Sequence, residues 1–194
     1  MSVRPPLRVS VTRHEEKEQK LREFVGRHLS ESDVGAGAQA SQILIVARSL
    51  DSPVVKAITG LTEEIAAAGL SVRLILAQLD REPLTEDWGR NVAFAHELRW
   101  AKHPRLIEAH EQLVLSPEIC WIGDCMRRDP AKCDAYESYV EDCGEATGCA
   151  TVSFERLWLA SAPLAARPSR RPAAPGALPP TVEALFQPTI GTRH

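Results

Sequence analysis

The chain has 194 residues, of which 44% are hydrophobic and 25% are charged, and its formal net charge is −3. This composition is typical of one globular domain with a buried core. A weakly acidic chain has no overall attraction for nucleic acid or anionic membranes, so binding of either would need a local basic patch, and none dominates the core.

The amino-terminal part of the chain predicts a tail, a helix and a linker. Residues 1–13 are expected to be a tail. A polar helix over His14–Leu29 follows, because its apolar residues recur at helical intervals. Residues 30–41 (SESDVGAGAQAS) are mostly small, which predicts a linker. Residues 1–41 are therefore expected to precede the main domain.

The main domain begins with a strand–helix–strand pattern. The unbroken apolar run Gln42–Val46 (QILIV) predicts a central strand that is covered on both faces. Ser52 is expected to cap a helix that starts at Pro53 and ends at Gly69. The segment Ser71–Leu76 predicts a second strand, reached by a right-handed crossover. This order indicates the α/β class.

The middle of the chain predicts a loop and a hairpin. The polar segment Leu79–Arg90 is expected to be a loop, and a third strand is expected within Asn91–Trp100. Two further strands, Glu111–Leu115 and Ile119–Gly123, are expected to form a hairpin. Pro117 lies between them, where a turn accommodates proline and a central strand would not.

The carboxyl-terminal part predicts two helices and a tail. The helices are expected around Ala131–Asp142 and over Val152–Ala160. From Ser161 onward the chain holds seven of its 14 prolines, and residues 165–194 are predicted to be a disordered tail. Within it, Thr181–Phe186 (TVEALF) predicts one short amphipathic turn that docks on a partner or on the domain, although an idle tail is the more common case.

Neither metal nor cofactor is expected. The five cysteines are odd in number and form no Cys-x-x-Cys pair, which predicts reduced thiols and no zinc site. His96, His103 and His110 recur at seven-residue intervals, unlike metal ligands on a helix. The amino terminus lacks the apolar region of a signal peptide, and no window approaches the ~18 apolar residues of a membrane span. We therefore expect a cytoplasmic protein that does not bind membranes.

The aromatic residues could be mistaken for a nucleic-acid platform. Trp121, Tyr136, Tyr139, Phe154 and Trp158 lie on predicted core elements, so core packing is the expected role. The acidic segment Asp134–Glu145 (DAYESYVEDCGE) is expected to be a solvent face, whereas base-stacking surfaces are flanked by lysine and arginine. The sequence thus gives no strong signal for nucleic acid.

The most specific pattern is His110–Asp129 (HEQLVLSPEICWIGDCMRRD). It resembles the active-site hairpin of the phospholipase D superfamily, which reads His-x-Lys-x4-Asp and then Gly-Ser-x-Asn at the end of a second strand. His110 stands at the histidine position. Gln112 replaces the lysine, Pro117 replaces the aspartate, and Gly123–Met126 (GDCM) stands for the last segment. The hairpin is kept, and most of the catalytic residues are replaced.

Two other blocks agree with this resemblance. The segment Pro53–Leu76 resembles the first helix and following strand of the superfamily, and Ser153–Leu164 is similar to its closing helix. The resemblance covers residues 42–164. It implies a mixed central sheet flanked by helices, present as a single half, with an additional N-terminal helix before it and the tail 165–194 after it.

The chemistry that the resemblance implies needs two histidines, one as nucleophile and one as general acid, with lysines holding the phosphate. One copy therefore implies a homodimer. His110 is the candidate nucleophile by position, but Gln112 cannot neutralise a phosphate. Such a loss costs ~3 kcal/mol or more of transition-state stabilisation. Arg127 and Arg128 are candidate replacements for that charge.

We therefore predict a catalytically degenerate binding or scaffold module that self-associates and binds an unknown protein or anionic small ligand. The candidate binding residues are Gln112, Asp124, Arg127 and Arg128. The alternative is an active phosphodiesterase or phosphotransferase dimer that uses His110 as nucleophile. An unrelated α/β regulatory protein stays possible if the strand order differs.

Overall fold

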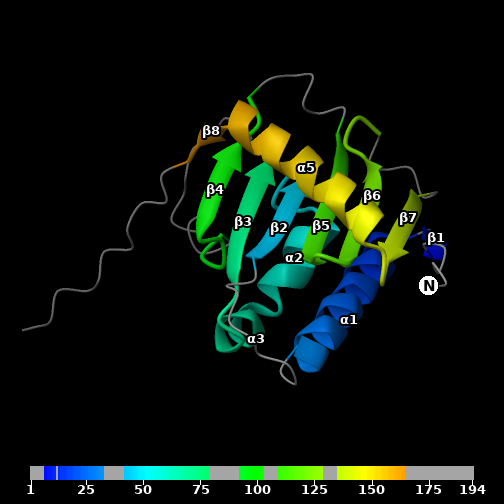
Figure 1. Cartoon of the computed structure of the whole chain (residues 1–194). Helices are drawn as coiled ribbons and strands as arrows, with labels where there is room; N and C mark the ends of the chain where they lie inside the picture. Colours follow the sequence, from blue (N-terminus) through cyan, green and yellow to red (C-terminus); the bar gives the residue numbers. More distant parts are fainter. Residues whose placement is uncertain are drawn as a thin grey trace, which may run out of the picture.

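A computed structural model describes residues 7–11, 13–32, 42–78, 92–102, 109–128 and 135–164. These residues form one mixed β-sheet between two helical layers (Figure 1). The elements in chain order are β1 (Leu7–Val11), α1 (His14–Ser32), β2 (Gln42–Ala47), α2 (Pro53–Thr59), α3 (Thr62–Ala67), β3 (Ser71–Leu76), β4 (Glu97–Trp100), β5 (His110–Ser116), β6 (Ile119–Cys125), β7 (Ala135–Val140), α5 (Gly144–Ala160) and β8 (Ala162–Pro163).

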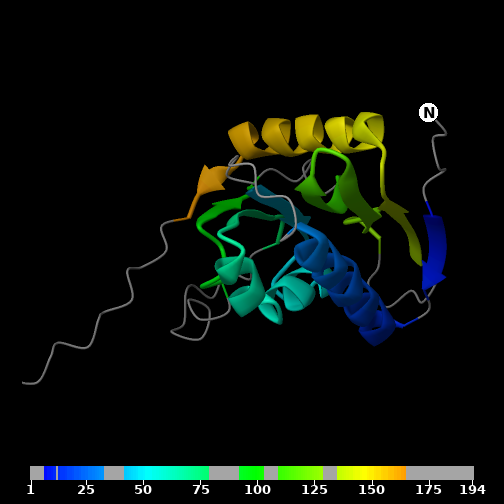
Figure 2. The ribbon, with the colours of Figure 1, turned by 60° about the horizontal axis from the view of Figure 1, so that its bottom comes forward.

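The eight described strands have the order β1-β7-β6-β5-β2-β3-β4-β8. The pairs β2–β3 and β3–β4 are parallel, and the remaining neighbours are antiparallel. Helix α5 covers one face of the sheet, while α1, α2 and α3 cover the other (Figures 1 and 2). The predicted mixed sheet, with both strands of the hairpin and the helix from Pro53 on one face, is confirmed.

Strand β2 is buried on both faces of the sheet, which explains its unbroken run of apolar residues. Ile43 and Ile45 belong to the hydrophobic core that α1 and α2 close, whereas Leu44 and Val46 belong to the core beneath α5. All four are buried. A strand with helices on both faces has no solvent side, so alternation with polar residues is absent.

The expected tail 1–13 is wrong for its second half, because Leu7–Val11 forms β1 at the edge of the sheet. The expected helix Ala131–Asp142 is also wrong, because Ala135–Val140 forms β7 between β1 and β6. Aromatic and β-branched residues in AYESYV fit a pleated surface. The pairing with two neighbouring strands supplies the hydrogen bonds that decide for a strand over a helix.

Smaller corrections concern the helix after β2 and the expected third strand. The helix divides into α2 and α3 around Gly60 and Leu61. Ser52 does not cap α2 with its side chain; its hydroxyl oxygen accepts the backbone N–H of Ser49 instead. Gly69 ends α3 with a φ of 68°, which glycine adopts without steric cost. In the third strand, only Glu97–Trp100 is extended.

The predicted core role of the aromatic residues is confirmed, since Trp121, Phe154 and Trp158 are buried. The acidic segment is not wholly a solvent face, because Glu137 is only 1% exposed. The helices predicted at His14–Leu29 and Val152–Ala160 lie within the longer α1 and α5. The linker 33–41, most of the loop Leu79–Arg90 and the tail 165–194 lie outside the described residues.

Candidate functional site

The most promising place for a ligand site is the edge of the sheet formed by strand ends, where β2, β3, β4 and β6 end and β5 begins. From β2 the chain continues to β3 and β4 on one side, and it later returns to β5, β6 and β7 on the other side. Ligands of open α/β sheets bind outside the carboxyl ends of the strands at such a switch point. The candidate residues His110, Asp124, Arg127 and Arg128 all lie at this edge.

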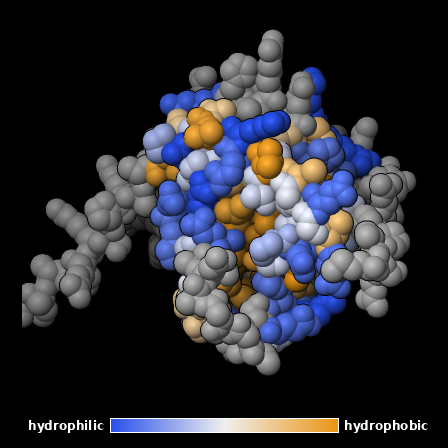
Figure 3. Space-filling model, in the orientation of Figure 1, coloured by the Kyte–Doolittle hydropathy of each residue, from blue (hydrophilic) through white to orange (hydrophobic). Residues whose placement is uncertain are grey.

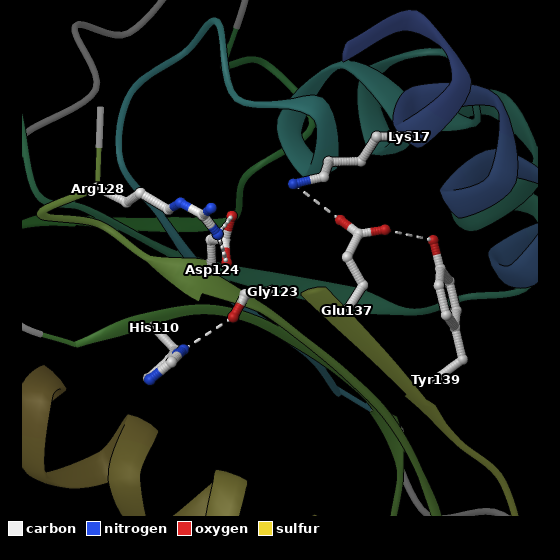
Figure 4. Close-up of polar contacts among 7 residues, drawn as sticks. All are labelled: Lys17, His110, Gly123, Asp124, Arg128, Glu137 and Tyr139. Atoms are coloured by element: carbon white, nitrogen blue, oxygen red, sulfur yellow. Dashed lines mark hydrogen bonds and ion pairs between the residues drawn. The ribbon is translucent and has the colours of Figure 1, made fainter. Parts of the chain in front are cut away.

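His110 is exposed at the start of β5. Its Nδ1 lies 2.8 Å from the carbonyl oxygen of Gly123 in β6. A carbonyl oxygen only accepts hydrogen bonds, so Nδ1 carries the proton and Nε2 holds the free lone pair. His110 lies on the α5 side of the hairpin, as Figure 4 shows.

Gln112 does not face a ligand site. It is 5% exposed, and its amide Nε2 donates to the carbonyl oxygen of Ala150 in α5 at 3.1 Å. This hydrogen bond joins the central strand β5 to the helix that covers it. Gln112 is therefore a packing residue of the α5 core, although the sequence resemblance predicts it at the lysine position of the hairpin motif.

Pro117 lies at the other end of the hairpin from His110. It is an exposed residue of the turn between β5 and β6. A strand rises about 3.3 Å per residue, so seven residues separate the two positions by roughly 20 Å. No side chain at position 117 can reach His110 within the same chain.

A cavity of about 220 Å³ opens at the same edge of the sheet, on the side of α1 and α2. Its lining includes Lys17, Arg48, Glu111, Asp124 and Arg128, and His110 is not among the residues that line it. Asp124 lies on the opposite side of the hairpin from His110 (Figure 4). Within a single chain, His110 and Asp124 therefore do not border the same groove.

The charged side chains around this cavity have partners within the chain. Arg128 contacts both carboxylate oxygens of Asp124 at 3.2 Å. The Arg48 guanidinium donates to the carbonyl oxygens of Met126 and Arg128, and the backbone N–H of Arg48 donates to the Glu111 carboxylate at 3.0 Å. These contacts fasten the end of β2 to β5 and to the turn after β6. The candidate residue Arg127 is exposed and does not line the cavity.

A buried ion pair adjoins the cavity. The Lys17 ammonium lies 2.9 Å from Glu137 Oε1, and the Tyr139 hydroxyl donates to Glu137 Oε2 at 3.2 Å (Figure 4). The Glu137 side chain is wholly buried and that of Lys17 is 12% exposed. Burial raises the pKa of Glu137, and the Lys17 charge opposes that rise. Burial, followed by the Glu137 charge, raises the pKa of Tyr139.

Sequence patterns did not find Lys17, Arg48, Glu111 or Glu137. Lys17 lies in α1, Arg48 follows β2 and Glu137 lies in β7. Glu111 lies within the hairpin pattern, at a position that the motif leaves variable. His96 has a structural role, because its Nδ1 accepts the backbone N–H of Val72 at 3.1 Å. His103 lies outside the described residues.

Gly123 has a steric explanation. A Cβ at this buried position would lie 2.4 Å from Cη2 and 2.6 Å from Cζ2 of the buried Trp121 indole. We predict that Gly123→Ala lowers the free energy of unfolding by about 1–3 kcal/mol, because a rigid ring must shift. Urea denaturation measures this. Gly26→Ala in α1, where a Cβ meets nothing within 4 Å, is the matched control and should be neutral or stabilising. Equal stability of both variants would contradict the steric explanation.

Neither a metal cluster nor a membrane helix is found in the part of the chain that the structure describes. No group of three or more histidine, cysteine or acidic side chains there could hold a metal ion. No described helix is long and apolar enough to cross a membrane. No disulfide bond joins any two of the four described cysteines (120, 125, 143 and 149).

Comparison of the sequence with protein-family models and with curated proteins finds no match. Solved structures with similar folds are found. TrmBL2, described as an archaeal chromatin protein with a novel mode of DNA binding, superposes with a TM-score of 0.53 at 13% identity, over 83% of this chain and 54% of that chain. This chain thus spans about half the length of TrmBL2.

Two further structures are similar over nearly their whole length. Nuc from Salmonella typhimurium, a phospholipase D family member, has a TM-score of 0.52 at 12% identity, and the match covers 82% of this chain and 99% of Nuc. NucT from Helicobacter pylori has a TM-score of 0.50 at 10% identity, with the same coverages. At these identities the likeness establishes the fold and leaves the activity open.

Proposed function

Because the chain has a phospholipase D-like fold, we propose that it is a catalytically inactive member of that fold, a binding module that self-associates. The observation that carries the proposal is the burial of Gln112 and its hydrogen bond to Ala150. The position that supplies a phosphate-neutralising ammonium in the superfamily here supplies a neutral amide to the core. We propose the cytoplasm as its location from the sequence alone.

The electrostatics of the strand edge support the same proposal. Stabilising a phosphoryl transition state needs cations aimed at the developing charge. Arg48 is engaged by two carbonyl oxygens, Arg128 by Asp124, and Lys17 by Glu137. A catalytic phosphate would have to compete with the Asp124 and Glu137 carboxylates for Arg128 and Lys17.

The cavity presents side chains of both charges to a ligand. Its cavity presents the Arg128–Asp124 pair and the Lys17 ammonium next to Glu111 and the exposed His14. A small anionic ligand with a hydrogen-bond donor fits this mixture better than a bare phosphate does, because carboxylates repel the latter. DNA binding is described for TrmBL2, and we do not transfer it to this chain, whose net charge is −3.

A second candidate function rests on His110. The ring is exposed, and the Gly123 carbonyl fixes the tautomer that leaves Nε2 as a nucleophile. An active phosphodiesterase dimer could use this nitrogen, with Arg127 or Arg128 for charge. The missing ammonium at position 112 makes this the weaker candidate.

We predict that the full chain does not hydrolyse a generic phosphodiester. With bis(4-nitrophenyl) phosphate as substrate, the unaltered chain and the His110→Ala variant should both release nitrophenolate no faster than buffer alone does. Turnover by the unaltered chain that disappears in His110→Ala would reject the inactive module and establish the phosphodiesterase. Turnover that survives His110→Ala would indicate a contaminating enzyme. Measuring hydrolysis in each fraction of the last chromatography step identifies it, because its activity does not co-elute with the protein.

A further inference from the structure

The outer face of α5 is uncovered by any described element. Figure 2 shows α5 as the outermost layer on its side of the sheet. Val152 and Leu159 on this face are 52% and 80% exposed, and they are the two large hydrophobic residues that are exposed among the described residues. In Figure 3, which looks onto this side, apolar surface is visible among hydrophilic side chains. Exposed apolar side chains on an uncovered helix face make this face a candidate interface.

The same face combines a hollow and a projection. Gly144 and Gly148 lie one helical turn apart and line a shallow groove together with Cys149 and Val152. Glycines leave room for another chain to approach the helix backbone closely. At the other end of the helix, Leu159 projects from the surface.

The exposed residues of α5 recur every seven residues, which is typical of a helix that pairs with another helix. Glu145, Val152 and Leu159 are seven residues apart, and Gly148 and Arg156 lie between them. A seven-residue repeat keeps one stripe facing a partner helix that crosses at about 20°. We propose that α5 pairs with α5 of a second copy, antiparallel, with the two-fold axis at Val152.

This register makes the face complementary to itself, as a two-fold interface requires. Positions 145 and 159 each lie seven residues from Val152, so Leu159 of one copy meets position 145 of the other. This contact lies next to the groove at Gly144 and Gly148. Four residues from Val152, Arg156 meets Gly148 and lies one turn from Glu145 of the second copy. Neither Glu145 nor Arg156 has an ion-pair partner among the described residues, so both charges are available to the second copy.

The size of the contact sets its strength. One pair of 17-residue helices buries less than the ~1,600 Å² of a standard interface. The dimer is therefore expected to dissociate in the micromolar range, on the order of 1–100 µM. The inference rests on the self-association in the proposed function, and it adds where the two copies meet.

Sedimentation equilibrium of the full chain tests the interface. The unaltered chain should pass from monomer toward dimer as its concentration rises to about 100 µM, and Val152→Arg should raise the dissociation constant more than about 30-fold, because two like charges meet on the axis. An unchanged thermal midpoint would show that Val152→Arg is folded. Lys20→Glu on the exposed surface of α1 is the control for a charge change and should leave the dimer intact.

Charge reversal and cross-linking test the register. Glu145→Arg and Arg156→Glu should each weaken the dimer about 3–10-fold, and the double variant should recover it. In a Cys149→Ser background, Val152→Cys should form a disulfide-linked dimer under mild oxidation. Leu159→Cys in the same background should not exceed the baseline of Cys149→Ser alone, because its two copies lie roughly 21 Å apart along the axis.

Three outcomes are decisive. A monomer at all concentrations would overturn both the interface and the proposed self-association. A dimer that ignores Val152→Arg would overturn the α5 interface alone. A disulfide at Leu159→Cys and none at Val152→Cys would overturn the antiparallel register. None of these outcomes depends on whether the chain hydrolyses phosphodiesters.

Discussion

Replacing Lys17 with methionine is expected to lower the free energy of unfolding by about 3–5 kcal/mol at neutral pH. The reason is the Glu137 carboxylate, which is wholly buried and has the Lys17 ammonium at 2.9 Å. Without that cation, the hydrogen bond from Tyr139 is the remaining contact among the described residues that stabilises the carboxylate charge. Chemical denaturation followed by tryptophan fluorescence measures the loss.

The double variant Lys17→Met with Glu137→Gln is the matched control. Glutamine has nearly the volume of glutamate, carries no charge and keeps an oxygen that accepts from the Tyr139 hydroxyl. We expect it to recover most of the lost stability, because removing both charges avoids the cost of leaving one buried. A double variant as unstable as Lys17→Met would show that the methylene packing of Lys17 matters more than its charge.

The pH dependence gives this prediction a second readout. Burial raises the pKa of Glu137 in the folded chain, so the folded state holds that proton more tightly than the unfolded state does. Stability from this group is therefore present at low pH and is lost as the pH rises through its folded pKa. Lys17→Met removes the charge that opposes the rise, so its destabilisation should shrink on acidification below neutrality. A loss that stays constant with pH would contradict the ion-pair explanation.

Placing a lysine at position 112, where the sequence resemblance predicts the lysine of the motif, is expected to damage the protein and to leave it inactive. Gln112 is buried between β5 and α5, so Gln112→Lys places an ammonium in the core and removes the hydrogen bond to Ala150. Burying an unpaired charge costs several kcal/mol, and we expect a loss of about 3 kcal/mol or more. The thermal midpoint and phosphodiester hydrolysis are measured on the same preparation.

Gln112→Met separates the charge from the hydrogen bond. Methionine has a similar volume and no charge, so the expected loss is only about 1 kcal/mol, the net value of one hydrogen bond. A Gln112→Lys variant that is stable and gains hydrolysis dependent on His110 would refute the packing role. It would also favour the phosphodiesterase as the ancestral activity of this hairpin.

The sequence by itself determined the central part of the fold. β2, β3 and the β5–β6 hairpin follow from apolar runs of strand length, bounded by residues that end elements, such as Gly69 and Pro117. The hairpin was also found through its resemblance to a known superfamily, and similar solved structures agree with the fold. These signals are local, so a single sequence contains them.

Only the tertiary structure decided how β1 and β7 join the sheet and how the residues of the site are arranged. β1 and β7 pair with each other across the length of the chain, and no local pattern identifies a partner so distant. His110 and Asp124 lie close in the hairpin sequence, yet the pleat and the register shift near His110 put their side chains on opposite faces. Lys17 meets Glu137 because α1 packs beside β7, and burial of that pair is a property of the packed elements that neither residue carries alone.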